Sequence, residues 1–579
     1  MKKLIILFVI VQLAVNGMAQ LIPGLNGDGT QSNPVQITSL SDLQALSLFV
    51  RGDAYTGTDA TRKNTYGKYF KLMQDIDMSA DLAFVPIGGY GSIIEYEKCF
   101  FAGAFDGNAH IISNLTIDIP STNEYGAGLF GNIDNALIEN LTLDNVNVFG
   151  YYYVGGLCGF LNNSSTIRNC SVAGRVSGME YNVGGLCGQS GSIMKVTVGG
   201  QEITVGGKNQ ILNCSSTAVV SGSILVGGLC GGQEGSTIKN CYAIGNVTGR
   251  GGIRIGGLIG ENEYASVITN SYAKGNVVGG NGSGRRFYVA GFCGDNSTES
   301  VIKNCYATGS VTGYGSETGG FCGINYRAEI SQCFATGSVE GRDNVGGFCG
   351  ANQANGLITD CYATGAVGTS YGDASYENMG GFCGEIGSST NSTPASIRRC
   401  YATGSVLEQF NSSRGGFSGR KNNGSDNSEC YYLNTNTTDV SGGIPKTATE
   451  MKALAFVNLL NNSEEKPWKS DVLPNVNNGF PLLAFYADSL PNATSVIQLV
   501  QEKNHLRVSS NPVLSGQSFR VETANSSQLK EAKIEVYNIT GQLIEKIDVI
   551  GTSTDIMLHV APGIYILKLQ QKTAKIVVR

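Results

Sequence analysis

The chain has 579 residues, including 80 glycines and only 12 prolines, and charged residues make up 15% of it. Glycine at this level without a three-residue period excludes collagen, and the low charge content excludes a charged disordered tail. The formal net charge of -6 and the presence of only three histidines provide no electrostatic footprint for nucleic acid and no histidine-rich metal site. We therefore expect no nucleic-acid partner and no cofactor.

The first residues have the pattern of a signal peptide. In MKKLIILFVIVQLAVNGMAQ two lysines precede an apolar run, and Gly17 and Ala19 occupy the small-residue positions that signal peptidase recognises. We assign residues 1–19 to this peptide. No later apolar stretch approaches the roughly 20 residues needed to cross a bilayer, so we expect an exported chain without a transmembrane segment.

Two short phrases recur through the centre of the chain. NCYATGSVTG at 304–313 has seven near-copies, and phrases such as VGGLCG at 154–159 alternate with them at a period of about 28 residues. A period of this length indicates a solenoid, in which each unit buries its apolar side against its neighbours. Within CYATGSV, small or apolar residues alternate with Tyr306 and its polar neighbours, as in a strand. We expect an all-β solenoid of about ten coils.

These phrases resemble those of the GLUG-repeat proteins, which are named for G-G-L-x-G and carry N-C-Y-A-T-G-x-V as its partner. The resemblance extends to GDGTQSNPVQITSLSDLQAL near the N-terminus and to TEMKALAFVNLL and NNGFPLLAF after the repeats. It implies a bacterial surface protein, adhesin-like in character. It also implies three successive parts: a capping segment at 20–125, the solenoid at 126–432 and a closing segment at 433–487.

The last 75 residues are predicted to form a separate small Ig-like β-sandwich, because short alternating strands are divided by turn residues. This segment resembles the type A C-terminal sorting domain of the type IX secretion system, with Ser509 and Ser510 where the family often has Tyr-Pro. The resemblance implies a linker at 488–504, a sorting domain at 505–579, export by the type IX machinery, cleavage by a sorting peptidase, and anchoring to surface lipopolysaccharide or release. The matching motif residues are Asn511, Pro512, Gly541, Gly563 and Tyr565.

Sixteen cysteines accompany the repeats. Seven coils carry cysteine in both phrases and two coils lack it in both, a joint loss expected of paired residues in an exported protein. The alternative is that cysteine serves as a small buried hydrophobe in two inward ladders. The candidate disulfides are Cys158–Cys170, Cys187–Cys214, Cys230–Cys241, Cys293–Cys305, Cys322–Cys333, Cys349–Cys361 and Cys383–Cys400, which leave Cys99 and Cys430 over.

An aromatic row is predicted beside the cysteines. If Cys305 faces the core, its neighbour faces outward, and stacking of the coils aligns the equivalent residues. Such a row could bind sugar rings or a partner protein, although β-propensity alone also favours tyrosine here. Replacing Tyr306, Phe334 and Tyr362 together by serine should then abolish binding while leaving the melting temperature near its original value. The row consists of Tyr242, Tyr272, Tyr306, Phe334, Tyr362 and Tyr401.

The residue types found just before the second cysteine of each coil, where side chains point outward, argue against catalysis. Glycosidases need paired carboxylates, whereas these positions hold Asn304, Gln332, Asp360 and Arg399, without an acidic cluster. We expect a non-enzymatic, adhesin-like protein that binds a glycan or a host or matrix protein. Two alternatives stay open: a carbohydrate-active enzyme with a site built from loops such as 190–210 and 368–380, and a purely structural surface protein.

Overall fold

The computed structural model of the protein forms two compact units, Met1–Ser470 with Phe480–Leu483, and Asp471–Gly479 with Ala484–Arg579. The signal peptide expected at 1–19 lies outside the described residues. The described residues are 20–51, 65–89, 99–122, 125–198, 201–280, 287–369, 378–388, 393–407, 413–422, 424–434, 442–471, 476–489, 506–508, 516, 518–523, 533–538, 542–548, 553–561, 563–569 and 572–578.

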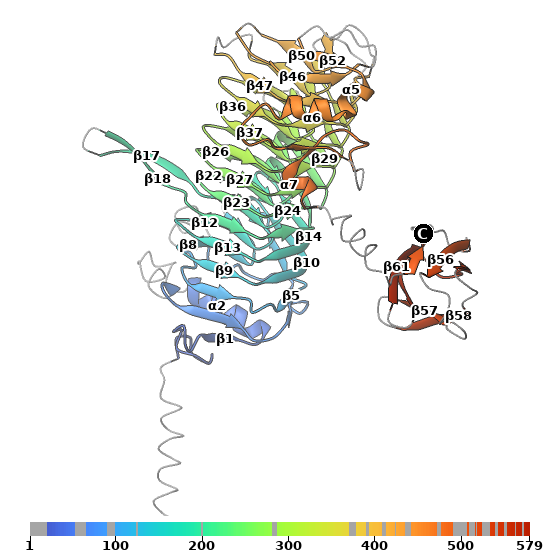
Figure 1. Cartoon of the computed structure of the whole chain (residues 1–579). Helices are drawn as coiled ribbons and strands as arrows, with labels where there is room; N and C mark the ends of the chain where they lie inside the picture. The colour runs from blue at the N-terminus through green and yellow to red at the C-terminus, as the bar shows by residue number, and fades with distance from the viewer. Residues whose placement is uncertain are drawn as a thin grey trace, which may run out of the picture. The chain divides into compact units, whose positions relative to one another are not determined.

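The first unit is a stack of coils built from three parallel sheets, and from β4 onward the successive coils contribute strands to all three (Figure 1). One coil runs through β9 (Leu137–Glu139), β10 (Thr142–Gly150), β11 (Tyr152–Gly155) and β12 (Cys158–Asn162). The 10-stranded sheet takes one strand from each coil, which confirms the expected all-β solenoid of about ten coils. Its other strands are β8 (Phe130–Asp134), β16 (Cys187–Ser190), β22 (Cys230–Glu234), β26 (Ile259–Glu263), β31 (Cys293–Ser297), β36 (Cys322–Tyr326), β41 (Cys349–Gln353), β46 (Cys383–Ile386) and β50 (Ser418–Lys421).

A 12-stranded sheet forms a second wall, and a 28-stranded sheet with several short strands per coil forms the third. Because pairing is parallel and in register, equivalent residues of successive coils lie above one another at the strand spacing of about 4.8 Å. Besides β9, the 12-stranded sheet contains β1 (Val35–Ile37), β2 (Tyr69–Leu72), β4 (Ala104–Asp106), β13 (Thr166–Arg168), β19 (Gln210–Leu212), β23 (Thr237–Lys239), β27 (Val267–Thr269), β32 (Val301–Lys303), β37 (Glu329–Ser331), β42 (Leu357–Thr359) and β47 (Ser396–Arg398).

The core consists of ladders of like side chains, because the repeat places the same residue type at the same inward position of each coil. The 12-stranded sheet supplies a column of fully buried isoleucines, among them Ile238, Ile268 and Ile302. The leucine or phenylalanine of the GGL/GGF phrase supplies another column. In it the rings of Phe292, Phe321, Phe348, Phe382 and Phe417 stack with centroids 4.6 to 4.9 Å apart.

The recurring asparagine and glycine of the NCYATG phrase are explained by the backbone conformation. The residue before the second cysteine turns the chain from the 12-stranded to the 28-stranded sheet with a left-handed backbone, as at Asn240, Asn270 and Asn304 (φ 52° to 57°). Asparagine tolerates this conformation better than most residues, which explains the N of NCYATG. The glycine of the same phrase is required by close approach, since a Cβ on Gly309 would lie 1.9 Å from the carbonyl oxygen of Gly275.

The end of the stack at β1 is covered by α2 (Leu40–Arg51), whose buried residues Leu43, Leu46 and Val50 belong to the main core. This cover protects the first coil from pairing with another chain. After the last coil, the closing segment forms α5 (Ala448–Lys452), α6 (Leu454–Leu460), β53 (Trp468–Lys469) and β54 (Leu482–Leu483). Thr447 and Glu450 form a capping box at the start of α5.

One insertion leaves the regular stack. Within the expected loop 190–210, β17 (Ile193–Val198) and β18 (Gln201–Gly206) form an antiparallel hairpin that projects from the coils in Figure 1. Residues 370–377 of the other expected loop lie outside the described residues.

The C-terminal unit contains two antiparallel sheets around a small apolar core, as expected of a β-sandwich. Gly563 begins one of its strands, and Tyr565 is buried and donates a hydrogen bond from its hydroxyl to the carbonyl oxygen of Ala561 at 2.8 Å. Asn511, Pro512 and Gly541 lie outside the described residues. The strands are β55 (Leu506–Val508), β56 (Ser518–Thr523), β59 (Ser553–Met557), β58 (Leu543–Asp548), β57 (Lys533–Asn538), β60 (Gly563–Leu569) and β61 (Lys572–Val578).

Candidate functional site

The predicted aromatic row is one continuous stack on the 28-stranded sheet. Its six residues begin six short strands: β24 (Tyr242–Ala243), β28 (Tyr272–Ala273), β33 (Tyr306–Ala307), β38 (Phe334–Ala335), β43 (Tyr362–Ala363) and β48 (Tyr401–Ala402). Successive strands pair in register, so each ring lies directly on the next. The ring centroids are 4.8 to 5.2 Å apart and successive planes are within 9° of parallel.

Only half of this row faces solvent, which corrects the expectation that all six rings point outward into open surface. Phe334, Tyr362 and Tyr401, hereafter the covered row, are 2%, 1% and 0% exposed. The closing segment packs on them: the Trp468 ring lies 5.5 Å from that of Tyr401, and the Tyr401 hydroxyl donates to the carbonyl oxygen of Pro481 at 2.5 Å. Sequence spacing alone does not reveal that a segment beyond the last coil turns back along the stack.

The other three rings, Tyr242, Tyr272 and Tyr306, are half-buried and form what we call the open row. Because neighbouring rings stack on one another, the open row presents mainly ring edges and hydroxyls; the exception is the outer face of Tyr242, whose register partner in the preceding coil is Ser215. The edge of an aromatic ring is its electropositive part. Stacking of sugars therefore has only this one ring face in the open row, and the rest of the surface is better suited to hydrogen bonding and to anionic groups.

A column of amides runs beside the open row. The side chain of Asn270 donates from Nδ2 to Oδ1 of Asn240 at 3.3 Å, and Asn304 donates likewise to Asn270 at 3.2 Å. The column begins at Asp106 and passes through Asn140, Asn169 and Asn213 with distances of 3.0 to 3.1 Å. Each amide uses one N–H within the column, so the surface offers regularly spaced polar groups along the stack axis.

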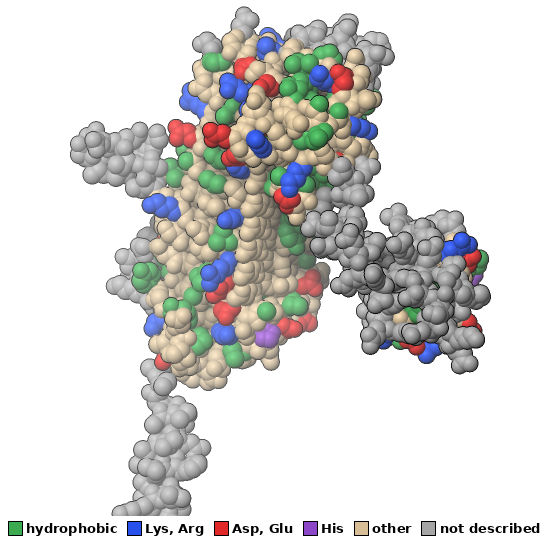
Figure 2. Space-filling model, in the orientation of Figure 1, with side chains coloured by type: hydrophobic (Ala, Val, Ile, Leu, Met, Phe, Trp, Pro, Cys, Tyr) green, Lys and Arg blue, Asp and Glu red, His purple; other side chains and the backbone are tan. Residues whose placement is uncertain are grey.

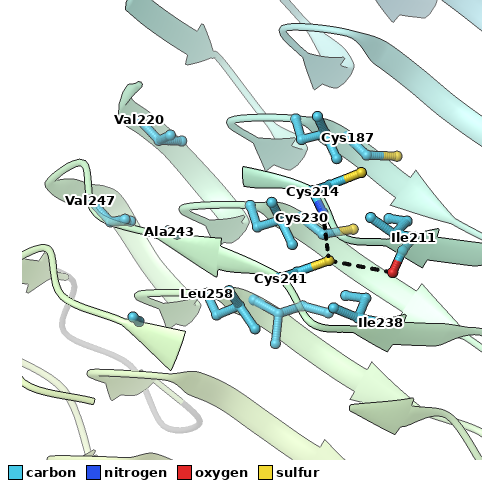
Figure 3. Close-up of a cluster of buried hydrophobic side chains, with 14 of the residues drawn as sticks. Cys187, Ile211, Cys214, Val220, Cys230, Ile238, Cys241, Ala243, Val247 and Leu258 are labelled. Atoms are coloured by element: carbon cyan, nitrogen blue, oxygen red, sulfur yellow. Dashed lines mark hydrogen bonds between the residues drawn. The ribbon is translucent and has the colours of Figure 1, made fainter. Parts of the chain in front are cut away.

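Fifteen of the cysteines, all except Cys99, form two columns, and none of the seven expected disulfides is present: all sixteen cysteines are free and buried. Figure 3 shows Cys187 and Cys230 of one column and Cys214 and Cys241 of the other among aliphatic side chains of the core. The two cysteines of a coil belong to different columns, and each thiol donates to a main-chain carbonyl two residues away, as Cys187 does to Gln189 at 3.2 Å. Burial raises the pKa of Cys241 well above its ordinary value.

Sequence reasoning missed a second aromatic cluster, in the coils near α2. The rings of Tyr125 and Tyr152 stack with centroids 4.9 Å apart, and Tyr181, which is 44% exposed, continues the stack at 6.0 Å from Tyr152. Tyr151 packs edge-on against Tyr152 at 4.6 Å. The three consecutive tyrosines of FGYYYVGG were the available signal.

A buried acidic pair was also missed. Glu261 and Asp295 lie on neighbouring strands of the 10-stranded sheet. The guanidinium of Arg254 lies 2.7 Å from a carboxylate oxygen of Glu261 and 2.9 Å from one of Asp295. Burial raises the pKa of Glu261 to about 8 and that of Asp295 to about 6, because one guanidinium offsets only part of the cost of burying two carboxylates. Their side chains are 9% and 6% exposed, so the pair does not offer a carboxylate to a polymer.

Comparison with known families identifies the coils and the last unit. The GLUG motif matches at 150–177, 222–248, 251–278, 286–312, 314–340 and 341–368. Residues 511–579 match a secretion system C-terminal sorting domain. Six segments of the coils are GLUG repeats, and residues 511–579 are a type IX sorting domain. This sorting domain implies that the protein is secreted.

A segment of the chain is also similar to halomucin of Haloquadratum walsbyi. The two sequences are 37% identical over 171 residues, which are 28% of this chain and 2% of halomucin. The matched segment is thus a small part of a far longer protein. In the described part of the chain, no helix is long and apolar enough to cross a membrane, and no group of three or more His, Cys, Asp or Glu side chains could hold a metal ion.

Proposed function

We propose that the protein is displayed on the bacterial surface and acts as a non-enzymatic, adhesin-like binding protein for a glycan or a host or matrix protein. The observation that carries this proposal is the open row: three stacked tyrosines and a parallel column of amides, repeated at constant spacing on a rigid stack. A rigid surface binds with little loss of conformational freedom.

The sorting domain supports a route to that location. By this proposal, the type IX machinery exports the chain, a sorting peptidase removes residues 505–579, and the remainder is anchored to surface lipopolysaccharide or released. Deleting 505–579 should leave the protein in the periplasm, and mass spectrometry of the surface protein should find this segment missing. Normal surface display of the deleted chain would refute the route.

Binding is tested by probing arrays of glycans and of host matrix proteins with the purified protein. Reproducible binding to a member of either array supports the proposal, whereas release of reducing ends from a polysaccharide would favour the carbohydrate-active enzyme instead. Absence of any ligand on both arrays would favour the purely structural surface protein.

A further inference from the structure

The chain segments that carry the open row contain no acidic residues. The chain as a whole has 46 acidic and 40 basic residues. In contrast, the segments 235–260, 264–280 and 300–316, which carry the open row, contain no Asp or Glu. Arg254 in these segments is committed to Glu261 and Asp295. The remaining cations are Lys239, Arg250, Lys274 and Lys303.

These cations flank the open row on both sides. Lys239 ends β23 and is in register, through Thr269, with Lys303 of β32. The two lysines are therefore two coils apart, about 9.6 Å along the axis. On the other side of the row, the ammonium of Lys274 lies 4.8 Å from the ring centroid of Tyr272. Lys239 and Lys274 are exposed, so both ammonium groups are available to a ligand.

Every group on this surface favours an anion. The ring edges of the open row carry the positive part of the aromatic quadrupole, and the amide column beside it supplies N–H donors. Nucleic acid fits this surface poorly, because bases bind single-strand platforms by stacking on several free ring faces, and within the open row only the outer face of Tyr242 has no ring stacked on it. A regular array of cations instead matches a polymer whose acidic groups repeat along its length.

We propose that the open row with Lys239 and Lys274 binds an acidic polysaccharide, carboxylated or sulfated, lying along the axis of the stack. The proposal rests on the proposed binding function and names the class of its ligand. The surface has a defined end, where an acidic residue returns at Glu329 and the closing segment covers the stack. Glu465 of that segment pairs with Lys303 at 3.1 Å and accepts a hydrogen bond from Gln332.

The test compares the purified protein with the variant Lys239→Gln/Lys274→Gln. The matched control is Lys208→Gln/Arg420→Gln, which removes two other exposed cations, one before β19 and one on β50. The probes are polygalacturonate, chondroitin sulfate and neutral dextran, with binding measured by calorimetry at low and high salt. We expect one or both acidic polymers to bind and dextran not to bind. The double variant should bind about tenfold more weakly or worse, the control unchanged, and added salt should weaken binding.

Melting curves establish that both variants are folded, since all four replaced side chains are exposed. Binding of polygalacturonate or chondroitin sulfate that is equal in all three proteins would overturn the proposed site. Binding of dextran or of a matrix protein without binding of either acidic polymer would overturn the ligand class and leave the proposed binding function standing. A protein that binds none of the three polymers and nothing on the arrays would refute both.

Discussion

Trp468 donates a hydrogen bond from Nε1 to a carboxylate oxygen of Asp360 at 3.2 Å, across 108 positions of sequence. The same carboxylate receives two hydrogen bonds from Arg399, at 2.9 and 2.7 Å. These contacts hold the closing segment against the coils that carry the covered row. Trp468 is the single tryptophan of the chain and is 2% exposed, so its fluorescence reports directly on whether the segment is docked.

Replacing Asp360 by alanine should loosen the closing segment. The change leaves the Arg399 guanidinium and the Trp468 N–H without their shared acceptor in a mostly buried place, at a cost of about 3 kcal/mol. In denaturant titrations, the emission of Trp468 should shift to the red at a lower concentration than in the wild type. Asp426→Ala is the control, because its pair with Arg398 is half exposed and is worth about 1 kcal/mol or less. Equal effects of the two changes would contradict the docking role of Asp360.

The two halves of the aromatic row should respond differently to the same substitution. Tyr362→Ser removes a ring that is 1% exposed and packs against Trp468, so unfolding should become easier by about 3 to 5 kcal/mol. Tyr272→Ser removes a half-buried ring and its two stacking contacts, with an expected cost of about 1 to 2 kcal/mol. Thermal melting of the two variants measures the difference. Similar melting temperatures would show that the closing segment does not cover Tyr362 in solution.

The period and the inward or outward sense of each residue could be predicted from sequence, because a solenoid repeats one cross-section. The alternation in CYATGSV places Cys305 in the core and Tyr306 on the row, and both positions are as expected. The covered row could not be predicted in the same way. Its burial depends on contacts such as that of Tyr401 with Pro481, 80 positions apart, which no local pattern encodes.

The disulfide interpretation of the cysteines failed for a related reason, whereas the alternative of small buried side chains in two inward ladders agrees with the structure. The two cysteines of a coil are present or absent together, which suggests that they are bonded to each other. Stacking produces the same pattern, since each coil must match the cross-section of its neighbours. Cys158 is in register with Cys187 of the next coil and not bonded to Cys170 of its own. The proximity of Glu261 and Asp295 was missed because it depends on the register between their two strands. Coils differ in length, so this register does not follow from a fixed sequence spacing.

The thiol columns predict the result of alkylation. With all sixteen cysteines free and buried, the native protein should react little with a thiol reagent. After denaturation without reductant, about sixteen thiols should be labelled per chain, counted by intact mass. Labelling of about two thiols, as the seven expected disulfides require, would show instead that the exported protein is oxidised and that its coils adjust to join the two columns.

The pair Glu261 and Asp295 predicts how stability depends on pH. Both carboxyls have a raised pKa in the folded protein, about 8 and about 6, so the folded state holds more protons than the unfolded state between about pH 4 and pH 8. Their contribution is fully present below the ordinary pKa of a carboxyl and is lost as pH rises through these values. We expect the free energy of unfolding to fall by about 5 kcal/mol from pH 5 to pH 9 on their account, most of it from Glu261. Glu261→Gln leaves Arg254 paired with Asp295 alone and should remove most of this decline, whereas the exposed Glu340→Gln should not. A decline of equal size in wild type and both variants, followed by denaturant unfolding at each pH, would assign the pH dependence to other groups.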